Sequence, residues 1–112
     1  MPEDVFSVLA SPVRRELLSI LRTAGPQPVQ MLASHFDMRR PSISEHLKVL
    51  KDAGLVIERK RGRQRYCHLD ARPLREVQLW LRPYERFWRD KLANLRVVLD
   101  AEDHEPGADD SR

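Results

Sequence analysis

Cysteine is almost missing from this sequence of 112 residues, because Cys67 is the only one. A single thiol excludes an intrachain disulfide and is most simply accommodated in a reducing cytosol. No run of apolar residues is long enough to span a membrane, and the N-terminal residues do not resemble a signal peptide. We therefore expect a cytoplasmic protein that has no membrane partner.

The patterns needed for catalysis or metal binding are also missing. No nucleophile stands beside a base in a recognisable motif, no glycine-rich loop could cradle a phosphate, and no carboxylate pair is placed in a credible pocket. We predict that the protein is not an enzyme. Metal ions such as zinc need converging thiolates, imidazoles or carboxylates, so we expect no metal and no cofactor. The histidines are instead scattered over separate segments, at His35, His46, His68 and His104.

Positive charge is in excess, and it is unevenly distributed. Residues 100–112 hold six acids and one base, whereas residues 1–99 carry 19 bases against 11 acids, a net charge of +8. Between Arg39 and Arg65, nine bases stand against three acids. A basic block inside a domain indicates a polyanionic partner. With 33% charged residues, an ordinary solvated surface is the alternative.

The length fits a single domain with a modest core. We predict one domain over residues 1–101 and a disordered acidic tail over residues 102–112. A short opening helix is expected around residues 5–10. Ser11 is then predicted to cap a second helix that has Pro12 at its first position, and Gly25 to follow its end near Ala24. The next helix is expected to begin at Pro28 and to bury Phe36.

Two helical segments separated by a short polar break occupy residues 29–54. In the second segment, Ile43, Leu47 and Leu50 recur at the spacing of one helix face, and the opposite face is polar. Helix, tight turn and helix indicate a helix-turn-helix, whose second helix, residues 41–53, enters the DNA major groove. A plain helical hairpin is the alternative from this stretch alone. The residues that we predict to meet bases or phosphates are Arg39, Arg40, Ser42, Ser44, Glu45 and Lys48.

After Gly54 the apolar spacing changes from helical to alternating. Two short strands around a loop that contains Gly62 predict a β-hairpin. Its cations would repel one another unless an anion lay among them. A helix-turn-helix followed at once by a basic hairpin is the order of a winged helix, whose wing follows the phosphate backbone or the minor groove. The sequence therefore predicts a mainly α fold with a small β-hairpin that binds double-stranded DNA. The predicted wing contacts, over residues 59–65, are Arg59, Lys60, Arg61, Arg63 and Arg65.

Asp70 is predicted to cap a helix from about Arg72 to Leu81, and Pro83 to force a boundary or kink near Arg82. Beyond it, apolar residues recur at spacings of 4, 4, 3 and 4, as in a helix seam. We expect this seam and the opening helix to form a homodimer interface. Intrachain core and an aromatic ligand pocket formed by Trp80, Tyr84, Phe87 and Trp88 remain alternatives. The predicted dimerisation residues are Val5, Phe6, Leu9, Tyr84, Trp88, Leu92, Leu95 and Leu99.

Individual side chains allow more than one role. Cys67 could be a redox sensor, since cations lower thiol pKa values and Arg65 lies two residues away on the same strand face. A lone cysteine on a half-buried strand is more usually inert packing. We predict a helix-surface position for His35, and a packing or hydrogen-bonding role for His46.

Three segments together resemble the ArsR/SmtB family of small winged-helix repressors. They read FSVLASPVRRELL from Phe6, RPSISEHLKVLKDAGLV from Arg40 and RGRQRY from Arg61, and the similarity covers about residues 4–99. The resemblance implies a homodimeric bacterial transcription regulator that binds a palindromic operator and is released by a signal, whose chemical nature the sequence does not specify.

The sequence departs from the metal-sensing members of this family. Their cysteine pair lies on the first helix of the helix-turn-helix, whereas residues 30–37 here contain no cysteine. A second family site uses Asp and His at close spacing on the C-terminal helix, but Asp90 has no nearby histidine. The segment 80–88 resembles a branch that often lacks metal ligands. The rival functional hypothesis is a winged-helix module that binds an acidic partner protein.

Overall fold

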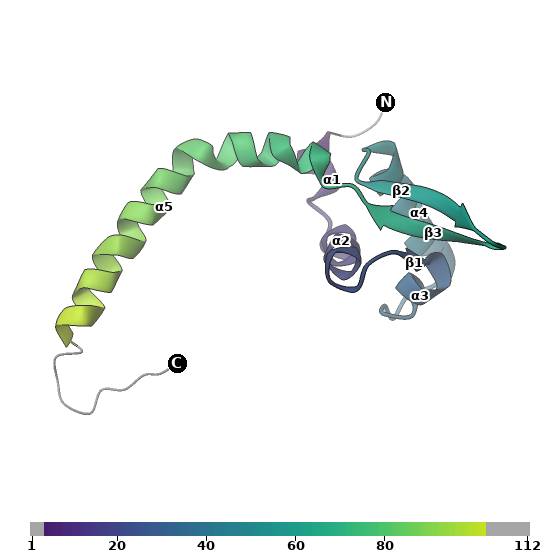
Figure 1. Ribbon diagram of the computed structural model, residues 1–112, viewed down its shortest axis with the longest axis horizontal. Coiled ribbons are helices and arrows are strands. Elements are labelled where there is room, and N and C mark those ends of the chain that lie inside the picture. Colours follow the sequence, from purple (N-terminus) through teal and green to yellow (C-terminus); the bar gives the residue numbers. More distant parts are fainter. Residues whose placement is uncertain (1–3, 103–112) are drawn as a thin grey trace. The chain divides into compact units, whose positions relative to one another are not determined.

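The computed structural model describes residues 4–102, and the side chains of residues 4–99. The predicted acidic tail therefore lies almost entirely outside the described residues. The chain divides into two compact units, residues 1–77 and 78–112, which are described separately. The elements are α1 (Val5–Val8), α2 (Pro12–Ala24), β1 (Gln27–Pro28), α3 (Val29–Ala33), α4 (Arg40–Asp52), β2 (Val56–Arg61), β3 (Gln64–Leu69), the 3-10 helix η1 (Arg72–Leu74) and α5 (Arg75–Glu102) (Figure 1). The predicted fold class, mainly α with a small β-hairpin, is confirmed.

Side-chain caps fix the first two helices. Asp4 Oδ1 accepts a hydrogen bond from the Ser7 amide at 2.8 Å, so α1 begins at Val5. Ser11 Oγ accepts from the Arg14 amide, and Pro12 occupies the first turn of α2. Gly25, with φ +86°, ends α2 after Ala24. The predicted cap and bounds of α2 are confirmed, whereas α1 stops two residues earlier than expected.

The sheet has three strands in the order β1-β3-β2, all antiparallel. β2 and β3 pair up to Arg61 and Gln64, so the turn of the wing is two residues, Gly62 and Arg63. Gly62 has φ +65°, the left-handed conformation that such turns need. The prediction of two strands was incomplete. β1 is only two residues long, and the second of them is a proline, so no alternating pattern could predict it.

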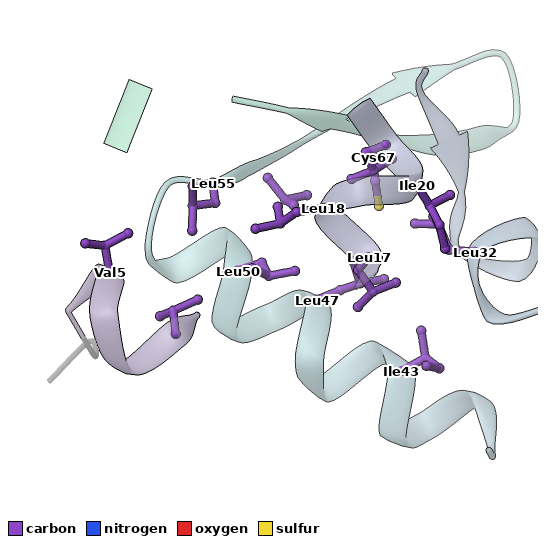
Figure 2. Packing of buried hydrophobic residues seen from close by; sticks show 13 residues of the cluster. Val5, Leu17, Leu18, Ile20, Leu32, Ile43, Leu47, Leu50, Leu55 and Cys67 are labelled. Atoms are coloured by element: carbon purple, nitrogen blue, oxygen red, sulfur yellow. The ribbon is translucent and has the colours of Figure 1, made fainter. Parts of the chain in front are cut away.

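The hydrophobic core of the first unit holds α4 in place. Ile43, Leu47 and Leu50 are at most 2% exposed, as the helical spacing predicted. In Figure 2 they lie along one side of α4, with Leu17 and Leu18 of α2 opposite. Because this face is buried, the polar face of α4 is directed to solvent.

Two helix boundaries differ from the prediction. α3 ends at Ala33, so Phe36 lies beyond it, although Phe36 still packs against the core. α5 continues through Pro83, so of the predicted boundary or kink near Arg82 the boundary is wrong, and the kink stays a prediction. Proline removes one helical hydrogen bond, from its own nitrogen to the carbonyl of Leu79. Since that stretch of the helix is exposed, water can hydrate the freed carbonyl.

Asp70 organises the passage from β3 to η1. Its Oδ1 accepts from the Arg72 amide at 3.1 Å, and its Oδ2 from the Arg72 guanidinium at 2.7 Å. These hydrogen bonds lower the pKa of Asp70 to about 2. The predicted helix cap at Asp70 is wrong, because Ala71 is the N-cap residue of η1 and η1 has no side-chain cap. The helical segment also begins with the short helix η1 rather than as one long helix. Among residues 4–102, no helix combines the length and apolar character needed to cross a bilayer.

Candidate nucleic-acid interface

The start of α4 carries the first group of predicted contact residues. Arg39 is the N-cap residue but makes no side-chain cap, and Arg40 is the first helical residue. Ser44, Glu45 and Lys48 are exposed on α4, while Ser42 is partly buried. Within the helix, Lys48 Nζ lies 3.3 Å from Asp52 Oδ2 in an exposed ion pair, of the kind that stabilises a helix only weakly.

A groove lies where the start of α4 faces the wing. It brings together side chains from four separate segments of the first unit. Three of its residues, Arg40, Arg63 and Arg65, were among the predicted contacts. The sequence did not single out the others as contacts, because only the tertiary fold places them there. The lining residues are Val29, Gln30, Arg40, Glu58, Arg63, Gln64 and Arg65.

Glu58 of β2 supplies an anion among the wing cations. Its Oε1 lies 3.4 Å from Lys51 Nζ of α4 and 3.5 Å from Arg65 Nη1 of β3. The guanidinium of Arg61 lies over the Tyr66 ring, 5.9 Å from its centroid. The sequence predicted that the wing cations repel one another unless an anion lies among them. Glu58, which belongs to the hairpin itself, supplies one such negative charge.

Arg14 of α2 links the N-terminal helices to α4. Its Nε donates to the Val8 carbonyl at 2.7 Å, and its Nη2 to the Ser7 carbonyl at 3.3 Å. Its Nη1 lies 3.4 Å from His46 Nδ1. The hydrogen-bonding role predicted for His46 is confirmed. His35 is exposed, as predicted, but it lies in the turn after α3 rather than on a helix.

Cys67 is fully buried in the core beneath the wing. Burial raises the pKa of its thiol, Glu58 raises it further, and Lys51 partly opposes the rise. A raised thiol pKa disfavours the reactive thiolate. The packing interpretation therefore fits the structure, and the redox interpretation does not. Within the described ranges, no three His, Cys, Asp or Glu side chains gather closely enough to hold a metal ion.

Apolar side chains are exposed along α5 in the second unit. The predicted seam residues there are each 48–64% exposed. The Trp80 and Tyr84 rings, at 5.2 Å between centroids, pack against each other in a tilted arrangement. In the opening helix Val5 is buried in the core of the first unit, Leu9 is partly buried, and Phe6 is 38% exposed. The seam residues are Tyr84, Trp88, Leu92, Leu95 and Leu99.

A helix-turn-helix followed by a basic two-stranded wing defines a winged-helix DNA-binding protein. Residues 9–59 match the model of a helix-turn-helix domain family. The chain is 36% identical to the HTH-type transcriptional regulator Rv2034 of Mycobacterium tuberculosis, over 90% of this chain and 91% of that protein. It is 33% identical to the arsenical resistance operon repressor of Escherichia coli, over 88% of this chain and 82% of that protein.

Solved structures agree with these relatives. A crystal structure of an ArsR family transcriptional regulator superposes with a TM-score of 0.65 at 35% identity, covering 80% of this chain and 97% of that chain. A homodimeric winged helix-turn-helix domain from Mycobacterium bovis, a possible ArsR-family regulator, has a TM-score of 0.57 at 27% identity, covering 72% and 75%. The chain belongs to the ArsR family of winged-helix transcriptional regulators, and it is a DNA-binding regulator.

Proposed function

We propose that the protein is a homodimeric repressor that binds a palindromic operator. Each protomer uses the recognition helix, residues 41–53, and the basic wing, residues 59–65. The observation that carries the proposal is the groove in which Arg40, at the start of α4, joins Arg63 and Arg65 of the wing. Cations from two elements that converge on one groove suit a backbone phosphate, which bidentate guanidinium groups bind well.

The exposed face of α4 is the surface proposed to contact DNA bases and so to recognise the operator sequence. Ser44 and Glu45 lie one turn inside the helix start and are exposed, and a glutamate can accept a hydrogen bond from cytosine N4. The proposed contacts with bases near the helix start or with phosphates also include Ser42, Lys48, Arg39 and the remaining wing cations. Phosphate contacts set the register, and base contacts supply the specificity.

Dimerisation is proposed through α5. Its seam side chains, from Tyr84 to Leu99, are about half exposed or more within the single chain, and a second copy would remove this apolar surface from water. The homodimeric state of the Mycobacterium bovis neighbour supports a dimer. Of the opening helix, Phe6 is exposed enough to contribute, whereas Val5 is already buried.

The arrangement explains repression by occlusion. Two recognition helices on one face of the duplex would enter successive major grooves, about one helical turn apart. A dimer that covers both half-sites blocks access of polymerase to a promoter that contains them. An inducing signal would release the dimer from its operator.

Selection of sites from a random duplex pool tests the proposal. Purified protein is used for the selection at physiological salt, and the mass of the bound complex is then measured by analytical ultracentrifugation. We expect enrichment of an inverted repeat that is bound by two protomers. Lack of enrichment, with equal binding to every duplex that disappears as salt rises, would contradict the proposal and favour a module for an acidic partner protein.

A further inference from the structure

Glu58 is the carboxylate in a groove whose other charged lining residues are all cations. The groove contains Arg40, Arg63 and Arg65, and Lys51 reaches Glu58 from α4 at 3.4 Å. The Glu58 side chain is only 21% exposed, so solvent screens its charge less than it screens an open surface charge. A phosphate that entered this groove would meet a fixed negative charge.

The same carboxylate connects the two elements that carry the proposed DNA contacts. Lys51 belongs to the last turn of α4 and Arg65 to β3, and both approach Glu58 Oε1. One oxygen therefore links the recognition helix to the wing. The pair with Arg65 is loose, at 3.5 Å with the Arg65 side chain 70% exposed. A phosphate can accordingly compete with Glu58 for this guanidinium.

We propose that Glu58 determines the specificity of DNA binding without contacting a base. The inference rests on the proposed DNA-binding function and deepens it. Glu58 weakens binding that depends on phosphates alone, because it repels phosphate and occupies Arg65. Through its pair with Lys51 it also adds a link between α4 and the wing, whose relative position matters most in a sequence-specific complex with many simultaneous contacts.

Both effects of Glu58 raise the specificity ratio, which is the affinity for the specific duplex divided by the affinity for a non-specific duplex. Non-specific binding is almost entirely an electrostatic interaction with phosphates, so a carboxylate in the groove reduces it directly. Specific binding adds contacts to base edges that depend on the orientation of the helix and the wing. Loss of the Glu58 charge should therefore strengthen non-specific binding. In specific binding, the loss of the link between α4 and the wing should offset that gain.

The test is Glu58→Gln, which keeps the size of the side chain and removes its charge. Affinity is measured for the duplex selected from the random pool and for a scrambled duplex of the same composition, over a series of salt concentrations. We expect binding of the scrambled duplex to strengthen roughly three- to tenfold and its salt dependence to steepen by about 0.9 per protomer, since Arg65 becomes available to a phosphate. Affinity for the selected duplex should change less, so the ratio falls.

Two control variants separate the groove from net charge and from folding. Glu16→Gln makes the same change of charge at an exposed position of α2 outside the groove, and should leave both affinities nearly unchanged. Glu58→Asp keeps a carboxylate in the groove and should keep the low affinity for the scrambled duplex. Thermal unfolding by circular dichroism verifies that each variant is folded.

The outcomes distinguish this inference from the proposed function. If Glu58→Gln leaves scrambled binding unchanged, or if Glu16→Gln raises it equally, then Glu58 has no special role and the inference is wrong. If Glu58→Asp binds scrambled DNA as tightly as Glu58→Gln does, the charge is not the cause. If the wild-type protein binds no duplex at all, the proposed function itself fails, and the inference fails with it.

Discussion

Arg63 is the second residue of the two-residue wing turn and also lines the groove at the start of α4. It is exposed, so its replacement should leave the core intact. A cation in this position is suited to a phosphate, and binding to a phosphate carries no sequence information. Its role is therefore expected to be the same on every duplex.

Arg63→Ala should weaken binding to all duplexes by a similar factor and reduce the salt slope by about 1 for each phosphate that a protomer no longer neutralises. Ser44→Ala, on the exposed face of α4, should instead alter the preferred sequence with little change in salt slope. Fluorescence anisotropy with selected and scrambled duplexes measures both quantities. An Arg63→Ala variant with unchanged affinity and slope would exclude the wing from the interface.

Cys67 gives a prediction at high pH. Its folded pKa is raised by burial, so its stability contribution is complete below the pKa of the unfolded thiol, about 8.5, and decreases as the pH rises past it. The free energy of unfolding of the wild type should therefore fall more steeply between about pH 7.5 and 9.5 than that of Cys67→Ala. Urea unfolding at the two pH values measures this difference. Parallel decreases in both proteins would show that the thiol is not protected.

Contact residues were predictable only where the sequence itself groups them. Arg40, Arg63 and Arg65 stand in obvious basic clusters, and the groove unites them. Glu58 gave no such signal, because an acid in a basic hairpin resembles a surface residue until Lys51 and Arg65 are found beside it. The glutamines that line the groove are equally ordinary in sequence. Their proximity depends on the packing of α3 and the wing against α4, which no local pattern encodes.

At the scale of elements, the helices with strong periodicity were predicted well. α2 and α4 follow their apolar spacing to within one residue, and α2 also begins at its predicted cap residue, Ser11, where burial and local hydrogen bonding favour the same bounds. β1 and the course of α5 were not predicted. β1 exists through its pairing with β3, and α5 passes Pro83 because exposure makes the absence of one hydrogen bond tolerable.

The wing turn provides a test at this scale. Gly62 has φ +65°, and a Cβ added there would meet nothing within 4 Å, so only backbone strain opposes a side chain. Gly62→Val should lower the free energy of unfolding by about 1–2 kcal/mol. Gly62→Asn should lower it less, because asparagine enters the left-handed region more easily. Chemical denaturation compares the two, and equal decreases would point to a cause other than backbone conformation.

α5 provides a second test. Leu92 and Leu95 lie on its exposed seam, and a charge there should oppose burial against a second copy. Leu92→Glu and Leu95→Glu should therefore shift the protein from dimer to monomer in sedimentation equilibrium. Val97→Glu introduces the same charge at an exposed apolar residue on the opposite side of the helix and should leave the dimer intact. A dimer that withstands both leucine changes would place the interface elsewhere.

At the scale of the whole molecule, charge and apolar surface are separated along the chain. The basic block and the groove belong to the first unit, and the exposed seam belongs to the second. This division suits a regulator in which one unit binds DNA and the other binds a second protomer. Two half-sites then contribute to one binding event, and affinity exceeds that for either half-site alone.

The most direct test compares two affinities. One is for the selected inverted repeat, and the other is for the same repeat with about 5 base pairs added between its half-sites. About half a helical turn is inserted, so the second half-site moves to the opposite face of the duplex. A homodimer that reads both half-sites should lose affinity by about a hundredfold or more, down to that for a single half-site. Unchanged affinity for the lengthened duplex would contradict a dimer that engages two successive major grooves.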